Sequence, residues 1–222
     1  MLLIFSGLDG AGKSTQINLL VDWFEKRGNK VSCLWARGGY TPGFEILKRF
    51  LRLLLGKGLP TPGKSISRKK KLARWSVAKL SLPIAILDLI FFWGVYLRLQ
   101  RLKSHIVICD RYLDDTRLDF KQNFPHVKLE SMFIWHLMNW LIPKPDMSVL
   151  LWVSVKKSVE RSLLKNEPFP DSPQVLKWRL SFYLDENEFP SRQFKKIECE
   201  DNIEIVNKNI IREVEFFLES KI

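Results

Sequence analysis

The sequence is poor in the residues that metal centres and disulfide frameworks need. Its 222 residues include only three cysteines and three histidines. Cys33, Cys109 and Cys199 lie far apart and form no CxxC pair. This pattern argues against a zinc site or a disulfide-stabilised fold, and it is typical of a protein in a reducing cytoplasm. His126 and His136 have no partner spacing that indicates acid–base chemistry.

The sequence also has little that would direct the chain to a membrane. Met1 to Phe5 is apolar, but it has no basic region and no small-residue cleavage site, so we expect no secretion signal. The longest apolar run, Leu80 to Leu97, contains Pro83 and Asp88. A charged residue at the centre of a span costs about 2.5 to 3.5 kcal/mol on insertion scales. We therefore expect a buried helix there, in a soluble, cytoplasmic protein.

Positive charge, by contrast, is in excess. Lysine and arginine total 36 against 24 aspartate and glutamate residues, which gives a formal net charge of +12. A surface this basic favours phosphates, nucleic acid or anionic membranes as partners. No motif interleaves aromatic and basic residues, so we expect no sequence-specific binding of nucleic acid.

Short apolar runs alternate with helical patterns along the chain, which is typical of a parallel sheet wrapped by helices. Most of these runs lack the alternation of half-exposed strands, as strands buried on both faces should. The class is therefore α/β, in a single domain over residues 1–222. We expect strands at Leu2–Phe5, Val31–Trp35, Ile106–Cys109, Met147–Val153 and Phe194–Ile197, and an amphipathic helix at Ile203–Leu218.

The first expected strand runs directly into a complete GxxxxGK[ST] motif, and a helical pattern follows it. This is a P-loop, in which backbone N–H groups and the positive end of a helix hold nucleotide phosphates. Lys13 is expected to bridge the β- and γ-phosphates, Ser14 to bind Mg²⁺, and Thr15 to cap or pack the first helical turn. The expected ATP-binding residues are Gly7, Leu8, Asp9, Gly10, Ala11, Gly12, Lys13, Ser14 and Thr15.

A second cluster of polar residues follows the run Ile106 to Ile108. Asp110 stands at the carboxyl end of that expected strand, where open α/β sheets bind their ligands. An acid at this place can hold Mg²⁺ or its waters. Arg111 beside it can present a planar donor fork to an acceptor phosphate. Arg37, followed by two glycines that allow close backbone approach, is a further candidate for phosphate contact.

Several segments together resemble the thymidylate kinase-like family of P-loop nucleoside monophosphate kinases. They are FSGLDGAGKSTQ, the CDRY sequence, the arginine and glycines at 37–39, SVERSLLK and RLSFYLDE. The resemblance implies a three-layer P-loop NTPase fold with a five-stranded parallel sheet flanked by helices. It also implies ATP with Mg²⁺ as the donor system and a nucleoside monophosphate, usually thymidylate, as the acceptor.

The resemblance further implies roles for particular residues. Asp9 would help to organise the acceptor, Arg37 would contact its phosphate, and a lid at residues 156–183 would bring a cation over the transferring group. Arg161, Lys165 and Arg179 are the candidates for that cation, and Arg161 is our choice. The expected catalytic residues are Lys13, Asp9, Arg111 and Arg161.

The segment 56–105 departs from the family pattern. The helix before the CDRY strand reads LDLIFF, where family members carry an arginine that holds the acceptor. Arg74 is the nearest replacement, so the expected acceptor-binding residues are Arg37, Arg74 and Arg111. A basic cluster, Arg68 to Lys71, precedes it and forms either a solvated surface or a cationic wall over the acceptor.

Three functional readings follow. The first is a kinase that converts dTMP to dTDP, and the second is a P-loop kinase of another small phosphorylated or hydroxylated metabolite. The third is a nucleotide-dependent switch at a membrane surface, anchored by the basic cluster next to an apolar segment. The partners are ATP and a small phosphorylated acceptor, with a homodimer and weak contact with anionic membranes left open. Trp135 and Trp140 either stack on a base or belong to the core.

Overall fold

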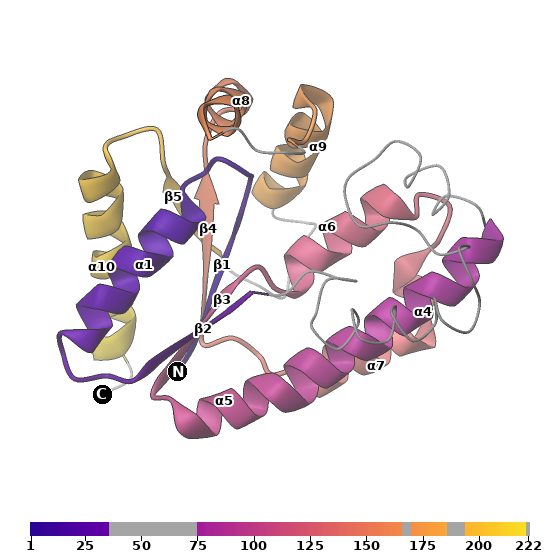
Figure 1. The fold of residues 1–222 in the computed structure, drawn as a ribbon, viewed down its shortest axis with the longest axis horizontal. Helices are drawn as coiled ribbons and strands as arrows, with labels where there is room; N and C mark the ends of the chain where they lie inside the picture. Colours follow the sequence, from indigo (N-terminus) through magenta and orange to yellow (C-terminus); the bar gives the residue numbers. More distant parts are fainter. Residues whose placement is uncertain (36–74, 166–169, 186–193, 221–222) are drawn as a thin grey trace. The chain divides into compact units, whose positions relative to one another are not determined.

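The computed structural model describes residues 1–35, 75–165, 170–185 and 194–220 (Figure 1). Arg37, Arg74 and the cluster Arg68 to Lys71 lie outside these residues, so their expected roles stay predictions. The chain forms two compact units. The first comprises Met1–Trp35, Arg101–Tyr112 and Lys144–Ile222, and the second comprises Ala36–Gln100 and Leu113–Pro143.

The first unit contains a five-stranded sheet in the order β2-β3-β1-β4-β5, with every neighbouring pair parallel. All five expected strands are confirmed, with ends that differ by at most two residues. The strands are β1 Leu2–Gly7, β2 Val31–Trp35, β3 Ile106–Asp110, β4 Met147–Trp152 and β5 Phe194–Glu198. The α/β class and the parallel sheet with flanking helices are therefore confirmed.

Burial explains why β1 occupies the centre of the sheet. Every residue of β1 is buried, whereas the edge strands β2 and β5 keep several exposed side chains. The register places Phe5 beside Asp110, Trp35 beside Asp110, and Gly7 beside Leu151. The carboxyl ends of the three inner strands therefore meet at one edge, at the loop that follows β1.

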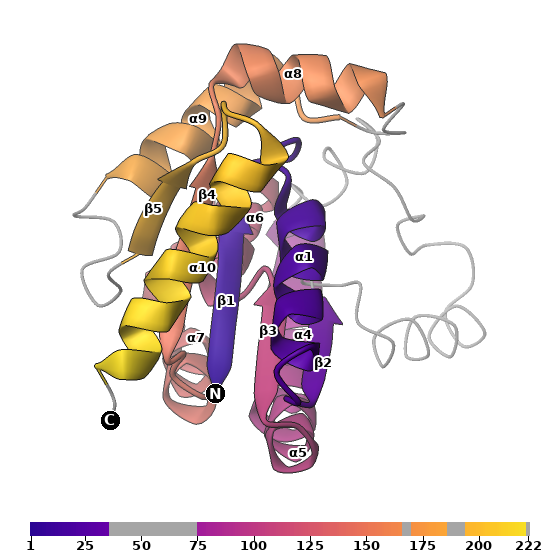
Figure 2. The same cartoon turned by 90° about the vertical axis from the view of Figure 1, so that its left-hand side faces the viewer.

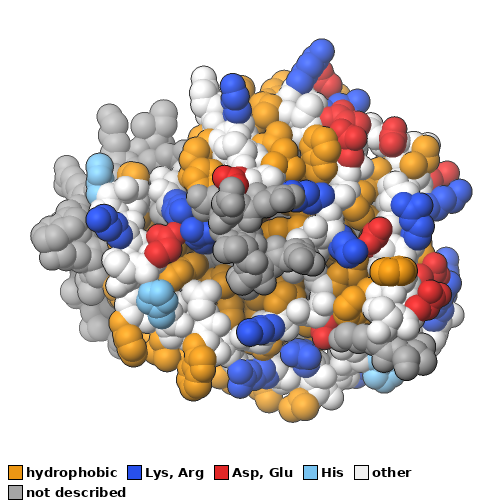
Figure 3. Space-filling view, turned by 180° about the vertical axis from the view of Figure 1, so that it is seen from behind, with side chains coloured by type: hydrophobic (Ala, Val, Ile, Leu, Met, Phe, Trp, Pro, Cys, Tyr) orange, Lys and Arg blue, Asp and Glu red, His pale blue; other side chains and the backbone are white. Residues whose placement is uncertain are grey.

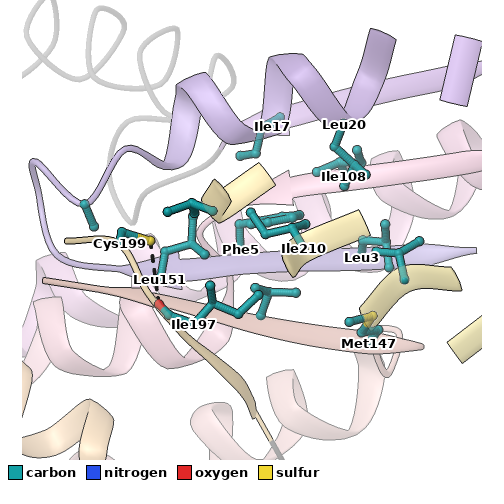
Figure 4. Packing of buried hydrophobic residues seen from close by; sticks show 14 of the residues in the cluster. Leu3, Phe5, Ile17, Leu20, Ile108, Met147, Leu151, Ile197, Cys199 and Ile210 are labelled. Atoms are coloured by element: carbon teal, nitrogen blue, oxygen red, sulfur yellow. Dashed lines mark hydrogen bonds between the residues drawn. The ribbon is translucent and has the colours of Figure 1, made fainter. Parts of the chain in front are cut away.

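Two helices cover one face of the sheet in this unit, α1 (Lys13–Glu25) and α10 (Ile203–Glu219) (Figure 2). Their apolar residues pack on the buried strands, as Ile17, Leu20 and Ile210 do in the cluster that also contains Phe5 and Ile108 (Figure 4). The expected helix at Ile203–Leu218 is confirmed. Gln16 joins the two helices, because its side-chain amide donates to the carbonyl oxygen of Ile203 at 2.9 Å.

The first unit also contains α8 (Val155–Leu164) and α9 (Pro173–Leu184), which lie within the expected lid segment. Serine side chains cap both helices at their N-termini. The hydroxyl of Ser154 accepts from the amide of Lys157 at 3.3 Å, and that of Ser172 accepts from the amide of Val175 at 3.4 Å. Each cap satisfies an amide that a helix start would otherwise leave without a partner.

The second unit is helical where it is described. The helix α4 (Trp75–Phe91) continues through a π-helical turn, Phe92–Tyr96, into α5 (Leu97–Lys103). It packs against α7 (Phe133–Leu141), and a guanidinium nitrogen of Arg98 donates to the carbonyl oxygen of Leu141 at 2.7 Å. The 3-10 turn Leu129–Ser131 is tied to α6 (Leu113–Asn123), because Arg117 and Lys121 both pair with Glu130 at 2.9 and 3.2 Å.

The expectation of a buried helix at Leu80–Leu97 is wrong for most of its surface. By length and composition, Ser81–Lys103 is the one helix among the described residues that could cross a membrane, and 33% of its most apolar window is buried. Ile86 and Leu89 are fully buried, whereas Leu87 and Phe91 are 53% and 65% exposed. The reason is that the helix has apolar side chains all around its circumference, so the contacts of one packed face cannot bury them all.

The tryptophans of α7 divide in the same way. Trp135 is 4% exposed and packs edge-on against Phe120, so its interpretation as a core residue is correct. Trp140 is 79% exposed, so the same interpretation is wrong for it. The two residues are five positions apart, and five helical steps turn the side chain well away from the packed face.

Candidate nucleotide-binding site

The loop between β1 and α1 depends on its glycines for both conformation and space. Gly7, Gly10 and Gly12 have φ angles of 142°, 78° and 85°, which L side chains rarely adopt. A Cβ at Gly7 would lie 2.0 Å from the carbonyl oxygen of Leu151, and one at Gly10 would lie 2.8 Å from that of Ser158. The first two glycines are therefore required by the packing of the protein itself.

Gly12 is different, because a Cβ built there meets no atom within 4 Å. It is the N-cap of α1, and no side chain caps that helix start. The space beside Gly12 at the start of α1 is therefore open. A cradle of this kind fits a phosphate, which is attracted by the amides and by the positive end of the helix dipole.

Lys13 begins α1, as expected, and its side chain folds back along the loop. It is 7% exposed, and its ammonium donates to the carbonyl oxygens of Gly7 at 3.0 Å and Leu8 at 2.8 Å. Ser14 and Thr15 are exposed. The expectation that Thr15 caps or packs the first turn is wrong, because α1 already starts two residues earlier and Thr15 points to solvent.

Asp110 is the last residue of β3, so it stands at the carboxyl edge of the sheet as expected. The chain turns sharply after it. Arg111 has a φ of 74°, the one positive φ of a non-glycine residue among the described residues, and its amide donates to the carbonyl oxygen of Phe5 at 2.9 Å. Non-glycine residues in this region are uncommon and gather at functional sites.

The turn directs the side chain of Arg111 toward the P-loop. Its guanidinium forms an ion pair with the carboxylate of Asp9, and the two side chains are 8% and 17% exposed. The structure therefore brings together two of the expected catalytic residues. A buried charge of this kind is costly to leave without its partner, so each residue fixes the position of the other.

The site also fits Mg²⁺ by its chemistry. The exposed hydroxyl of Ser14 and the carboxylate of Asp110 are hard oxygen donors, which this ion prefers. Within the described part of the chain, no group of three or more His, Cys, Asp or Glu side chains could hold a metal ion. Mg²⁺ commonly keeps several waters and takes one or two protein ligands with substrate phosphates, so a sparse site suits it.

Helix α8 also contacts the P-loop, through the side chains of Ser158 and Arg161. Arg161 donates through one guanidinium nitrogen to the carbonyl oxygen of Gly10 at 3.3 Å, and through another to that of Cys199 at 2.9 Å. The hydroxyl of Ser158 donates to the carbonyl oxygen of Asp9 at 2.6 Å. Arg161 thus lies next to the loop, and its role as a lid cation stays a prediction. Ser158 is a neighbour of the loop that sequence reasoning missed. Serine on a polar helix carries no signal of such a contact.

The other two lid candidates are placed differently. Lys165 caps the end of α8 and is exposed. Arg179 is 3% exposed within α9, where its Nε lies 3.4 Å from a carboxylate oxygen of Asp171. A buried arginine that is paired in this way supports the packing of α9. Of the three candidates, Arg161 donates to a P-loop carbonyl oxygen, that of Gly10.

The residues that follow β5 complete this side of the site. Glu200 accepts from the amide of Ser154 at 2.6 Å, and this hydrogen bond lowers the pKa of its carboxyl group. Burial raises the pKa of the neighbouring Cys199 thiol to about 11, so this cysteine is neutral at pH 7. The loop after β5 therefore provides an acceptor for the start of α8 and a carbonyl oxygen for Arg161.

A further polar group lies in the second unit. Asp114, Asp115 and Asp119 on α6 are 5%, 1% and 3% exposed, and Thr116 between them is 1% exposed. Each of these three acids takes part in further polar or electrostatic interactions. Our sequence reasoning did not single them out, although the spacing of Asp115 and Asp119 places them on one face of a helix.

The chain is similar to known thymidylate kinases in sequence and in fold. No family profile matches the chain. It is 27% identical over 223 residues to a probable thymidylate kinase of Thermococcus kodakarensis, with 98% of each chain covered. It is 25% identical over 229 residues to the thymidylate kinase of Caldicellulosiruptor saccharolyticus, with 99% of this chain and 98% of the relative covered. The crystal structure of thymidylate kinase from Ehrlichia chaffeensis has the same fold, with a TM-score of 0.53, 20% identity and 96% of this chain and 98% of that chain covered.

The sheet order, the P-loop between β1 and α1 and the acid at the end of β3 define a P-loop phosphotransferase fold. The sequence relatives narrow this class. The chain is similar in sequence to thymidylate kinases, which is the resemblance that its motifs predict.

Proposed function

We propose that this protein transfers the γ-phosphoryl group of ATP to a nucleoside monophosphate, with dTMP as the acceptor and dTDP as the product. The observation that carries the proposal is the P-loop cradle, in which the space at Gly12 is open and Lys13 lies against the loop. The names of the sequence relatives support dTMP as the acceptor, since they are thymidylate kinases or probable thymidylate kinases.

Positioning and neutralisation of charge are the chemistry that these residues can supply. An acceptor phosphate oxygen is already a competent nucleophile, so the reaction needs no general base. The amides of the P-loop and the ammonium of Lys13 bind the donor phosphates. Mg²⁺, when bound, neutralises the charge on the β- and γ-phosphates, and we propose Ser14 and Asp110 as the residues that hold it or its waters.

We assign the acceptor side to Arg111, with Arg37 and Arg74 as further proposed contacts. Asp9 would keep Arg111 in place through their ion pair, and Arg161 would present the lid's positive charge next to Gly10. The segment 156–183 remains our proposed lid within a single kinase domain, and we propose that the enzyme works in the cytoplasm.

The proposal is tested with a panel of acceptors. The purified protein is incubated with ATP, Mg²⁺ and one nucleoside monophosphate at a time, and ADP release is measured against a reaction without acceptor. We expect dTMP to give the largest kcat/KM in the panel. A larger value for another monophosphate would reassign the acceptor, whereas no stimulation by any of them would contradict the kinase function.

A further inference from the structure

Helix α8 is attached to the P-loop by polar groups instead of by its leucines. Leu163 and Leu164 are 65% and 83% exposed, whereas Ser158 and Ser162 are fully buried and 4% exposed. A helix on a protein surface ordinarily buries its apolar side chains. The contact of α8 with the P-loop therefore includes specific hydrogen bonds, which Ser158 and Arg161 make to the carbonyl oxygens of Asp9 and Gly10.

The contact at Ser158 fixes the orientation of one peptide group in the P-loop. Its hydroxyl donates to the carbonyl oxygen of Asp9 at 2.6 Å. A trans peptide is planar, so the amide N–H of Gly10 points away from the carbonyl oxygen that precedes it. Holding the oxygen of Asp9 toward α8 therefore aims the amide of Gly10 away from α8. Inward-pointing amides of this kind are the groups with which a P-loop binds phosphate.

The same contact reaches the acceptor side of the proposed site. The residue whose backbone is held by Ser158 is also the residue whose carboxylate pairs with Arg111. A shift of the Asp9 backbone would therefore move the Asp9 carboxylate and weaken its ion pair with the guanidinium of Arg111. Gly10 permits the close fit, since any Cβ there would lie 2.8 Å from the carbonyl oxygen of Ser158.

We infer that Ser158 is a positioning residue: it holds Asp9 so that the Gly10 amide faces the donor phosphates and the Asp9 carboxylate stays against Arg111. The second part of this inference rests on the proposed kinase function, because it concerns the acceptor. The first part concerns ATP alone and can be measured without turnover.

The first experiment compares Ser158→Ala with Ser162→Ala. Both serines are buried on the same face of α8, but it is Ser158 that donates to the carbonyl oxygen of Asp9. We expect Ser158→Ala to weaken ATP binding by about fivefold in titration calorimetry, as loss of one neutral hydrogen bond should. Ser162→Ala is expected to stay within about twofold of wild type. Equal ATP affinities for the two variants would overturn the inference.

The second experiment separates positioning from a merely structural role. Ser158→Ala is combined with Asp9→Asn, and acceptor KM and ATP affinity are measured for all four proteins of the cycle. We expect Ser158→Ala to raise acceptor KM about fivefold in the wild-type background and less than about twofold when Asp9 has lost its charge. Its effect on ATP affinity should persist in both. An acceptor effect of equal size in the two backgrounds would mean that Ser158 does not act through the Asp9 carboxylate.

A third variant keeps the test decisive if Ser158→Ala does not fold. Ser158→Cys keeps a weak donor of similar size, so ATP affinity should fall between wild type and Ser158→Ala. If circular dichroism shows that the alanine variant is unfolded, the comparison of wild type with Ser158→Cys decides the question. Equal ATP affinities of these two proteins would then contradict the inference. If wild type binds ATP but phosphorylates no acceptor, the proposed function fails, whereas the ATP measurements still decide the role of Ser158.

Discussion

The P-loop and the long helix Ser81–Lys103 are held in place in opposite ways. In the P-loop, individual atoms decide the fit: Gly7 and Gly10 leave no room for a Cβ, and Lys13 is bonded to two backbone carbonyl oxygens. In the helix, apolar side chains are spread around the circumference, and only 33% of the most apolar window is buried. The first region is specified mainly by geometry and the second mainly by hydrophobicity.

This difference shows which sequence signals can be interpreted with precision. A motif that imposes backbone conformation limits each position to one or two residue types, so its presence predicts a structure. An apolar run only says that the segment avoids water, and many partners can satisfy it. The excess of lysine and arginine likewise does not specify where on the surface a partner would bind. In Figure 3, lysine and arginine side chains are spread among hydrophobic ones and do not form one patch on the described surface of that face.

The largest effect is expected at the P-loop. Lys13→Ala should lower kcat/KM for ATP by at least about a hundredfold, because it removes the ammonium that we propose binds the transferring phosphate. Lys26→Ala, at the exposed end of the same helix, is the matched control and should leave the kinetics unchanged. Thermal melting checks that both variants are folded. Turnover of Lys13→Ala near that of wild type would remove the basis for the assignment of the P-loop.

The long helix provides the opposite test. Leu89 is fully buried and Leu102 is 84% exposed. Leu89→Ala should lower the free energy of unfolding by about 2 to 5 kcal/mol, and Leu102→Ala should change it by less than about 0.5 kcal/mol. Urea denaturation measures both. Similar losses for the two variants would show that the face containing Leu102 is covered in the protein in solution.

Alanine substitutions at two glycines of the first unit distinguish the cost of backbone strain from the cost of steric overlap. Gly10 and Gly28 have φ angles of 78° and 76°, but a Cβ at Gly28 meets nothing within 4 Å. Gly28→Ala should cost about 1 to 2 kcal/mol through the positive φ alone. Gly10→Ala should cost about 1 to 3 kcal/mol more, because α8 must move. Urea denaturation again provides the measurement, and equal losses would show that α8 is not packed on the loop.

Arg111 tests whether the acceptor is bound at the carboxyl edge of the sheet. Arg111→Ala should raise the acceptor KM about ten- to a hundredfold, with a smaller effect on the KM of ATP, because a charge-assisted contact to the acceptor phosphate is lost. Arg27→Ala removes an exposed arginine that pairs with Glu215 and is the control. Equal losses for donor and acceptor would contradict this division of roles.

Asp110 is expected to give the smallest of these effects. Asp110→Asn keeps the shape of the side chain and removes the charge that we propose holds Mg²⁺ or its waters, so we expect an about tenfold higher Mg²⁺ requirement and slower turnover. A titration with Mg²⁺ at saturating ATP measures this. An unchanged titration curve with normal turnover would make Asp110 a structural residue.

The sequence predicted the sheet and the loop because their signals are local. Buried strands need continuous apolar runs, and the P-loop motif fixes its own conformation. The pairing of Asp9 with Arg111 was not predictable, since 102 positions separate the two residues and only the register of β1 with β3 brings them together. Ser158 was missed for the same reason. Its contact depends on the approach of α8, which a polar helix pattern does not encode.

The helix Ser81–Lys103 shows the complementary failure. Proline and aspartate within the run led us to expect a buried helix, but by length and composition this helix could cross a membrane, and 33% of its most apolar window is buried. These two residues gave no information about which face would be packed. The expected acceptor residues Arg37 and Arg74 lie outside the described residues, so their placement remains a prediction from sequence. Kinetic comparison of Arg74→Ala with Arg111→Ala would show whether both contact the acceptor.

The most direct test of the central claim is to follow the phosphoryl group itself. ATP labelled in its γ-phosphate is incubated with dTMP, Mg²⁺ and the wild-type protein, and the nucleotide products are separated. Our account predicts that the label appears in dTDP in amounts equal to the ADP formed, and that Lys13→Ala abolishes both. Label that appears only as inorganic phosphate, with no labelled dTDP, would contradict it.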